Sequence, residues 1–122
     1  MADEIRTSIS FSAAKGGASI ATGTLADTAD MSGVDMGTVT QSIGTTNEAL
    51  DVPADVSGDV WLVVKNLDAT NYVEIFKDSG NSHLLSKLNP GEACQLTRVP
   101  ANALFGRANT AAVQIQMWIS EA

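Results

Sequence analysis

The sequence predicts an all-β fold, a single-domain antiparallel β-sandwich of jelly-roll type with about eight to ten short strands. Three observations lead to this prediction. Apolar and polar residues alternate over many short runs, which is the period of a strand that buries one face. Turn-forming residues recur about every 8–12 residues, the spacing expected of short strands in a sandwich. No stretch of the chain has a convincing helical period.

The first half is rich in Gly, Ser, Thr and Ala, and its strand signals are weaker. IRTSISF (5–11) alternates and predicts a strand. Glycines then interrupt a Thr-rich and Ile-containing stretch, so we expect one strand near 18–25, followed by an acidic loop. MGTVTQSIG (36–44) predicts a strand of modest strength. EALDV (48–52) predicts a short strand or an extended segment, which ends at Pro53.

The second half opens with two strongly apolar runs joined by the polar segment NLDATN. These runs, VWLVVK (60–65) and YVEIFK (72–77), predict an antiparallel hairpin built on a type I turn. Asp68 can accept a backbone hydrogen bond two residues further on, as in an Asx-turn. Strands that are this continuously apolar are covered on both faces, or on one face and by an interface.

Four further elements complete the predicted sandwich. HLLSKL (83–88) predicts a short strand, and NPGE (89–92) has the Pro and Gly positions of a type II turn. ACQLTRV (93–99) alternates again and ends before a proline. After a brief apolar segment at 103–105, residues 111–120 predict a last strand with one Val-Ile-Met-Ile face and one Gln-Gln-Trp face.

The length of the chain limits the number of domains, and its net charge limits the class of partner. A chain of 122 residues fits one domain, 1–122, in which 1–35 is expected as a partly extended N-terminal arm. The net charge is −7, most of it in the first half, and no basic stripe is present. Such a surface repels phosphate backbones, so nucleic-acid binding is not expected.

The chain lacks the sequence features of membrane or secreted proteins. No apolar run approaches the ~20 residues of a membrane helix, and MADEIRTSIS has neither a basic leader nor an apolar stretch. Cys94 is the one cysteine, which excludes an internal disulfide. We therefore expect synthesis and folding in a reducing cytoplasm.

Recognisable catalytic chemistry is absent. The one histidine, His83, is expected as an exposed residue at a strand end, and Cys94 as a small core residue. One His and one Cys cannot make a zinc site without several carboxylates, and the acids do not have the spacing of an EF-hand. We therefore expect no enzyme, no cofactor and no metal. A structural calcium and a carboxylate pair for glycoside hydrolysis remain alternatives. The acids considered for calcium are Asp27, Asp30, Asp35 and Asp78.

Aromatic residues on polar strand faces suggest an interface. Trp118 shares its predicted face with two glutamines, and Trp61 shares its face with Lys65. An aromatic in this setting can mark an interface, or it can cover a sheet edge or pack under a loop. The spare apolar face of the two central runs also favours oligomerisation. The candidate interface residues are Trp61, Tyr72, Phe76 and Trp118.

The second half resembles small proteins encoded in the structural gene clusters of tailed bacteriophages. The resemblance is carried by GDVWLVVKNLDATNYVEI, LNPGEACQLTRVP and LFGRANTAAVQIQMWISEA, with TQSIGTTNEALDV upstream. It covers roughly residues 36–122, whereas the first 35 residues resemble no family. It implies a β-rich virion structural protein without a catalytic signature.

Within that family, the resemblance implies a non-enzymatic capsid decoration (cement) protein. It would bind the major capsid protein on the capsid exterior as a homo-oligomer, with a trimer favoured, after synthesis in the host cytoplasm. A tail, connector or fibre-base subunit is an alternative, and residues 12–35 could be its mobile arm. A carbohydrate- or receptor-binding sandwich that uses Trp61 or Trp118 is another, and an enzyme that uses His83 or Cys94 is a third.

Overall fold

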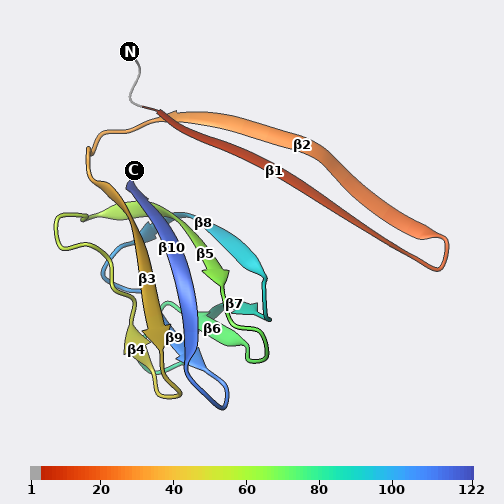
Figure 1. The fold of residues 1–122 in the computed structure, drawn as a ribbon. Helices are drawn as coiled ribbons and strands as arrows, with labels where there is room; N and C mark the ends of the chain where they lie inside the picture. Colours follow the sequence, from red (N-terminus) through yellow and green to blue (C-terminus); the bar gives the residue numbers. More distant parts are fainter. Residues whose placement is uncertain (1–3) are drawn as a thin grey trace. The chain divides into compact units, whose positions relative to one another are not determined.

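The computed structural model describes residues 4–122 and divides the chain into two compact units. The first unit ends at Ser32 and contains a two-stranded hairpin, and the second begins at Gly33 and is a β-sandwich. Every regular element within the described residues is a strand (Figure 1). The predicted all-β class is confirmed, and the segment 1–35 expected as an N-terminal arm is divided between the two units, because the first unit ends at Ser32.

The hairpin pairs two long antiparallel strands, β1 (Glu4–Lys15) and β2 (Ala18–Asp30). The connection consists of Gly16 and Gly17, with φ angles of +59° and +88°. These are the positive values that a type I′ turn requires at both central positions, and glycine adopts them without a steric cost. A tight turn of this type matches the twist of the strands that it joins.

The predicted acidic loop after residue 25 is wrong, because β2 continues to Asp30. Its last five residues pair with β1, for example Asp27 with Thr7 and Asp30 with Glu4. Acidic residues are rare in strands that bury a face, but most of this hairpin is exposed, so its carboxylates stay hydrated. A bulge sets Phe11 opposite two residues of β2 and interrupts the register between Ser10 and Ser12.

The second unit is an antiparallel sandwich of two four-stranded sheets. One sheet has the order β3-β10-β5-β8 and the other β4-β9-β6-β7, and every connection except that between β6 and β7 changes sheet. This is the strand order of a jelly roll, which the sequence predicted. The strands are β3 (Met36–Ile43), β4 (Glu48–Ala49), β5 (Asp59–Asn66), β6 (Val73–Phe76), β7 (Leu84–Leu88), β8 (Ala93–Pro100), β9 (Phe105–Ala108) and β10 (Val113–Glu121).

The predicted hairpin between 60–65 and 72–77 is wrong. Both runs form strands, but β5 pairs with β10 and β8, whereas β6 pairs with β7 and β9 in the other sheet. The polar loop therefore carries the chain across the sandwich instead of reversing it. Asx-type hydrogen bonds shape this loop: the Asp68 carboxylate accepts from the backbone N–H of Thr70 at 3.0 Å and of Asn71 at 2.6 Å.

The core lies between the two sheets and is almost entirely aliphatic. The inward faces are those that the alternation predicted: Val60, Leu62 and Val64 on β5 are at most 1% exposed. The apolar face of β10 is buried in the same way, and its outward face carries the glutamines and Trp118. The core members with essentially no exposure are Ile43, Val60, Leu62, Val64, Val73, Ile75, Val113, Ile115 and Met117.

Asn66, at the end of β5, is a fully buried polar residue that joins the two sheets. Its side-chain amide donates to the carbonyl oxygens of Asn71 at 2.9 Å and Leu88 at 3.0 Å. Its Oδ1 accepts from the backbone N–H of Asp68 at 2.8 Å, so both ends of the amide are satisfied. One side chain thus fixes the loop from β5 to β6 and the end of β7.

The predicted type II turn at 89–92 is confirmed and lies beside Asn66. The Glu92 N–H donates to the Asn89 carbonyl oxygen at 3.0 Å, and Gly91 has φ +81°. The turn also pairs with Asn66 through the backbone, because the Gly91 N–H donates to the Asn66 carbonyl oxygen at 3.1 Å. The crossing from β7 to β8 is therefore fixed by the same residue as the crossing from β5 to β6.

Candidate functional site

The four predicted interface residues do not form one surface. Trp61 and Trp118 share the outward face of the β3-β10-β5-β8 sheet, as residues of neighbouring strands. Tyr72 precedes β6 in the other sheet, and the Lys87 amine lies 4.1 Å from its ring centroid. Phe76 is only 2% exposed, and the Arg107 guanidinium lies 5.2 Å from its ring. The structure therefore brings the two tryptophans together and leaves Phe76 without an accessible surface.

The outward side chains around the tryptophans form an apolar patch, which we call the tryptophan face: Met36, Trp61, Val63 and Trp118. Trp118 lies opposite Val63 on β5, and Ser120 lies between Met36 and Trp61. Met36 is 63% exposed, Trp118 41% and Val63 36%, while Trp61 is half-buried. A patch of this kind on a polar sheet face is typical of a protein interaction site.

Trp61 has the most unusual environment within the tryptophan face. The Arg98 guanidinium lies 5.7 Å from its ring, and Arg98 itself has a positive φ of 54° at a bulge between β5 and β8. The indole Nε1 is buried and has no hydrogen-bond partner among the described residues. Such a donor is usually satisfied in a folded protein. Trp61 is therefore both a packing residue and part of the exposed patch.

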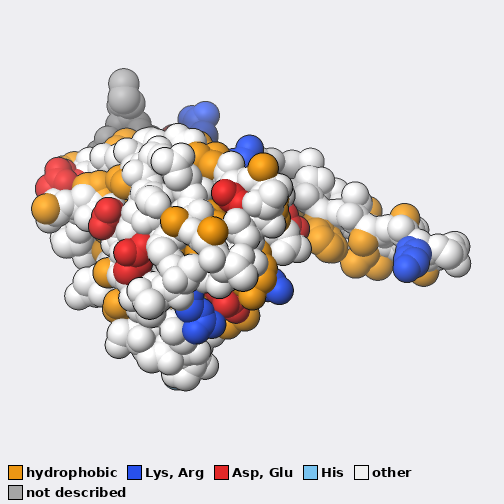
Figure 2. Space-filling view, turned by 60° about the horizontal axis from the view of Figure 1, so that its bottom comes forward, with side chains coloured by type: hydrophobic (Ala, Val, Ile, Leu, Met, Phe, Trp, Pro, Cys, Tyr) orange, Lys and Arg blue, Asp and Glu red, His pale blue; other side chains and the backbone are white. Residues whose placement is uncertain are grey.

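The hairpin carries a second apolar surface, which we call the hairpin apolar face: Ile9, Phe11, Ile20 and Leu25. The alternation of β1 and its register with β2 place all four on one side. Their exposed fractions are 45%, 56%, 64% and 54%, respectively. Figure 2 shows hydrophobic side chains along the hairpin. The other side carries serine, threonine, alanine and the charged residues Glu4, Arg6 and Asp30.

The sequence pattern indicated only two of the four residues of the hairpin apolar face. The alternation of Ile9 and Phe11 was visible within 5–11. Ile20 and Leu25 were not connected to it, because Gly23 interrupts their pattern. In the structure, Gly23 has φ +65° and belongs to the bulge opposite Phe11, which restores the side-chain alternation on both sides.

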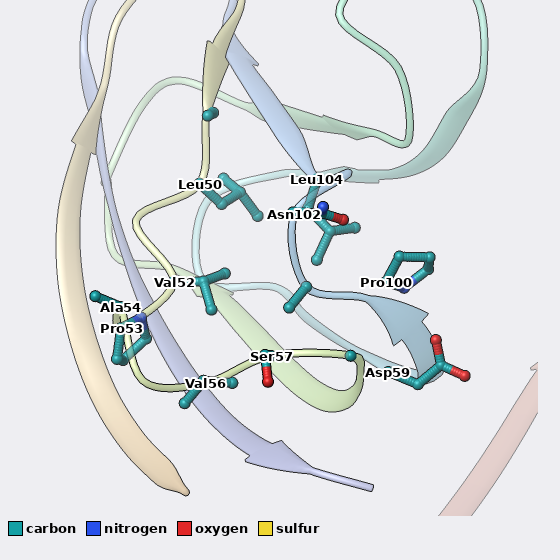
Figure 3. Close-up of a pocket in the computed structure, with 13 residues that line it drawn as sticks. Leu50, Val52, Pro53, Ala54, Val56, Ser57, Asp59, Pro100, Asn102 and Leu104 are labelled. Carbon is teal, nitrogen blue, oxygen red and sulfur yellow. The ribbon is translucent and has the colours of Figure 1, made fainter.

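An open apolar groove of about 500 Å³ lies at one end of the sandwich (Figure 3). Its walls come from the connection between β4 and β5 and from the loop after β8. The apolar lining includes Leu50, Val52, Val56 and Leu104, and Asp59 is the one charged residue among the lining residues. Ligand sites generally combine such walls with several convergent polar groups. The groove therefore lacks the convergent polar groups that would identify a ligand.

His83 is exposed, as predicted, and is close to a serine and an aspartate. The Ser82 Oγ donates to the Asp78 carboxylate at 2.6 Å, and the His83 Nδ1 is 3.4 Å from that hydroxyl. Because the serine proton points to the carboxylate, the imidazole is not placed to remove it. Asp78 also accepts from the backbone N–H groups of Ser82 and His83. The three residues shape the turn between β6 and β7.

The other candidate residues for chemistry are dispersed. Cys94 packs against the core, and burial raises the pKa of its thiol. Among residues 4–122, no group of three or more His, Cys, Asp or Glu side chains is placed to hold a metal ion. Across the same residues, no helix is long and apolar enough to span a membrane.

Carboxylates that accept backbone hydrogen bonds make the protein sensitive to acid. The Ser57 N–H, followed by that of Asp35, lowers the pKa of Glu121 from its ordinary 4.5. The backbone N–H of Asn71 lowers the pKa of Asp68, and the Ser82 hydroxyl lowers that of Asp78 to about 2. Asp35 acts in the opposite direction, because burial, followed by the carboxylates of Asp55 and Glu121, raises its pKa.

We expect the free energy of unfolding to fall as pH decreases from 4.5 to about 2. A folded pKa below the unfolded value stabilises the protein above the unfolded pKa, and protonation removes that contribution. Three lowered pKa values act in this direction, and the raised pKa of Asp35 acts against it. Urea unfolding at pH 7, 4.5 and 2.5 measures the effect, and Asp78→Asn should reduce the loss in the lower half of this range. A constant urea midpoint would contradict the prediction.

Comparison with family models, with curated proteins and with solved structures finds no match to this chain. Arguments about function therefore depend on the two apolar surfaces, the jelly-roll topology and the charge of the chain.

Proposed function

We propose that this chain is a non-enzymatic structural subunit of a bacteriophage virion, a capsid decoration protein that binds the outer lattice and stabilises it. The observation that carries the proposal is the hairpin apolar face. Two strands of 12 and 13 residues form this surface, and its four large apolar side chains are 45–64% exposed. An isolated two-stranded hairpin is at best marginally stable in water, so covering this face in an assembly would stabilise it.

Fold and charge support the same proposal. Jelly rolls occur in viral capsid proteins, and here the topology agrees with the phage resemblance of residues 36–122. Fold alone does not define function, so the surfaces carry the argument. A net charge of −7 favours the outer surface of a capsid over the DNA-filled lumen, where phosphate charge repels acidic proteins.

The mechanism would be mechanical. The tryptophan face and the hairpin apolar face belong to different units of the chain, so one molecule has two surfaces for two neighbours. A subunit that contacts a capsid protein through one surface and a further copy of this chain through the other links neighbouring positions of the lattice and resists their separation by the packed DNA. About 800 Å² per partner suffices for a specific interface. The major capsid protein is the proposed partner, together with further copies of this chain, which is made in the host cytoplasm.

Trp118→Ala should weaken binding to assembled shells by at least about tenfold, because exposed tryptophans often dominate interface energies. Trp118 is 41% exposed, so its removal should change monomer stability much less than shell binding. Gln114→Ala, on the same outward face of β10, is the matched control and should bind normally. Co-sedimentation with expanded shells measures binding, and thermal unfolding measures stability.

The result with wild-type protein tests the proposal itself. Saturable binding of the full chain to shells would support a decoration protein. Binding only to tail or connector assemblies would identify a subunit of those structures instead. The exposed Trp118 also suits a sugar ring, so a carbohydrate-binding module is the second candidate. That candidate predicts a rise in melting temperature with a glycan and no binding to shells.

A further inference from the structure

We propose that the hairpin apolar face is covered by the same face of a second copy, packed face to face and antiparallel about a two-fold axis at Phe11. This inference deepens the proposed assembly function and rests on it only in that the chain acts as an assembly subunit. It differs from the trimer that the phage resemblance favours, because a two-fold contact of this kind joins two chains.

The hairpin is strictly divided into an apolar face and a polar face. Ile9 lies opposite Leu25, Ala13 lies opposite Ile20, and Phe11 lies between these two pairs. On the reverse side, Ser8, Ser10 and Ser12 pair with small residues. Only one face can therefore bury a substantial apolar area. On that face, the pair of Ile9 and Leu25 and the pair of Ala13 and Ile20 lie on either side of Phe11, so a two-fold axis can pass through the level of Phe11.

Along β1, the apolar face is complementary in size to the same face of a second copy. A two-fold axis at Phe11 places the level of Ile9 and Leu25 over the level of Ala13 and Ile20 of the second copy. In this arrangement Ile9 on β1 faces the small Ala13, Leu25 on β2 faces Ile20, and the two Phe11 rings meet at the centre. Sheets that pack face to face interdigitate their side chains at a separation of ~10 Å, which such alternation of size allows.

The charges on the apolar face also favour the antiparallel arrangement. The apolar face carries one basic residue, Lys15 beside the turn, and one acidic residue, Asp27, opposite Thr7. The same two-fold axis brings Lys15 of each copy to the level of Asp27 of the other. A parallel packing would instead place Lys15 near Lys15 and Asp27 near Asp27. Opposite charges favour the antiparallel arrangement, and like charges disfavour the parallel one.

The buried area predicts a weak dimer. Four large apolar side chains per copy cover less than the ~800 Å² per partner of a standard interface, so the dimer should form in the micromolar range or above. On a capsid, attachment of neighbouring copies to the lattice would raise their effective concentration and promote the same pairing.

Charge reversal in the full chain provides the test, with the dimer dissociation constant measured by sedimentation equilibrium at low salt. Lys15→Asp and Asp27→Lys should each weaken the dimer by about tenfold, because each change acts twice in a symmetric dimer. The double variant should return close to the wild-type value. Within one hairpin the two residues are ~26 Å apart, so rescue cannot come from a contact inside one chain.

The polar side of the hairpin offers matched controls. Arg6→Asp and Asp30→Lys make the same changes in charge on the opposite face and should leave the dimer unchanged. Single reversals with no effect, a double variant weaker than both singles, or a wild-type chain that is monomeric at several hundred micromolar would each overturn the pairing. Shell binding that persists in such a monomer would leave the proposed function intact. A normal dimer that does not bind shells would overturn that function alone.

Cross-linking fixes the register independently of charge. In a Cys94→Ala background, Ile9→Cys and Ala13→Cys are prepared as separate full-length proteins, mixed, and treated with a short bismaleimide that spans the ~10 Å between packed sheets. The mixture should give heterodimers in excess over either protein alone, because Ile9 faces Ala13 across the proposed axis. Preferential cross-linking of each protein with itself would mean a parallel pairing and would overturn the antiparallel arrangement.

Discussion

Asn66→Ala should lower the free energy of unfolding by about 3 kcal/mol, because it removes three hydrogen bonds from a fully buried side chain at roughly 1 kcal/mol each. The substitution leaves the carbonyl oxygens of Asn71 and Leu88 and the N–H of Asp68 without these side-chain partners. An unpaired buried polar group costs more than an exposed one, so the full effect is expected. Urea unfolding followed by tryptophan fluorescence measures the change.

Asn109→Ala is the matched control for this prediction. The Asn109 side chain also has a buried oxygen, but that Oδ1 has no hydrogen-bond partner among the described residues. Its removal should therefore cost less than 1 kcal/mol, or even stabilise the fold, on the same principle. Equal losses in the two variants would mean that the cost arises from packing volume and not from the hydrogen bonds of Asn66.

A chain that begins at Gly33 should keep the melting temperature of the sandwich within a few degrees and bind shells at least about 100-fold more weakly. The core cluster is built from residues between Ile43 and Ile119, so none of it is lost with the hairpin. The truncated chain, in contrast, loses all of the hairpin apolar face, through which neighbouring copies on the lattice would pair. An effect of this size corresponds to about 2.7 kcal/mol of binding free energy, which several buried apolar side chains can supply.

Two readouts separate the outcomes of that truncation. Circular dichroism and thermal unfolding report whether residues 33–122 fold alone, and co-sedimentation reports binding. A folded sandwich that binds shells normally would place attachment on the tryptophan face and remove the hairpin from the proposed function. A truncated chain that fails to fold would contradict the division into two independent units. A full-length Phe11→Ser variant would then test the contribution of the hairpin to binding.

The sequence predicts the parts of this fold that depend on neighbouring residues. The period of two in β5 and β10 identifies their buried faces, because one residue decides the direction of the next. Likewise, Pro90 and Gly91 define a type II turn within four residues, and the structure has that turn. The fold class follows from the same local signals, since many short alternating strands fit few architectures.

Strand partners could not be predicted in the same way. The runs around Val64 and Val73 are adjacent in the chain and equally apolar, and a hairpin would satisfy both locally. The structure separates them because β10, far along the chain, pairs with β5. The buried amide of Asn66 favours the crossing, yet a lone asparagine in a loop has no sequence signal that distinguishes it from an exposed one.

The candidate surfaces could be predicted only in part, again because strand pairing depends on residues that are distant in the sequence. Trp118 lies on an outward face, as its glutamine neighbours suggested, whereas Phe76 is covered by Arg107 from β9. That cover depends on a strand about thirty residues away and on the irregular register at Phe76. The hairpin apolar face needed the bulge at Gly23 to align its two halves, and a bulge is decided by pairing and not by local pattern.

The position of β10 has a consequence for synthesis on the ribosome. Among the ten strands of residues 4–122 it is translated last, yet it lies between β3 and β5 in its sheet. Until it emerges, those two strands have no partner between them, and their apolar residues stay exposed to water and to other nascent chains. The hairpin, whose contacts are local, can form early. The sandwich should therefore fold late and in one step, which makes its nascent form a natural client for chaperones.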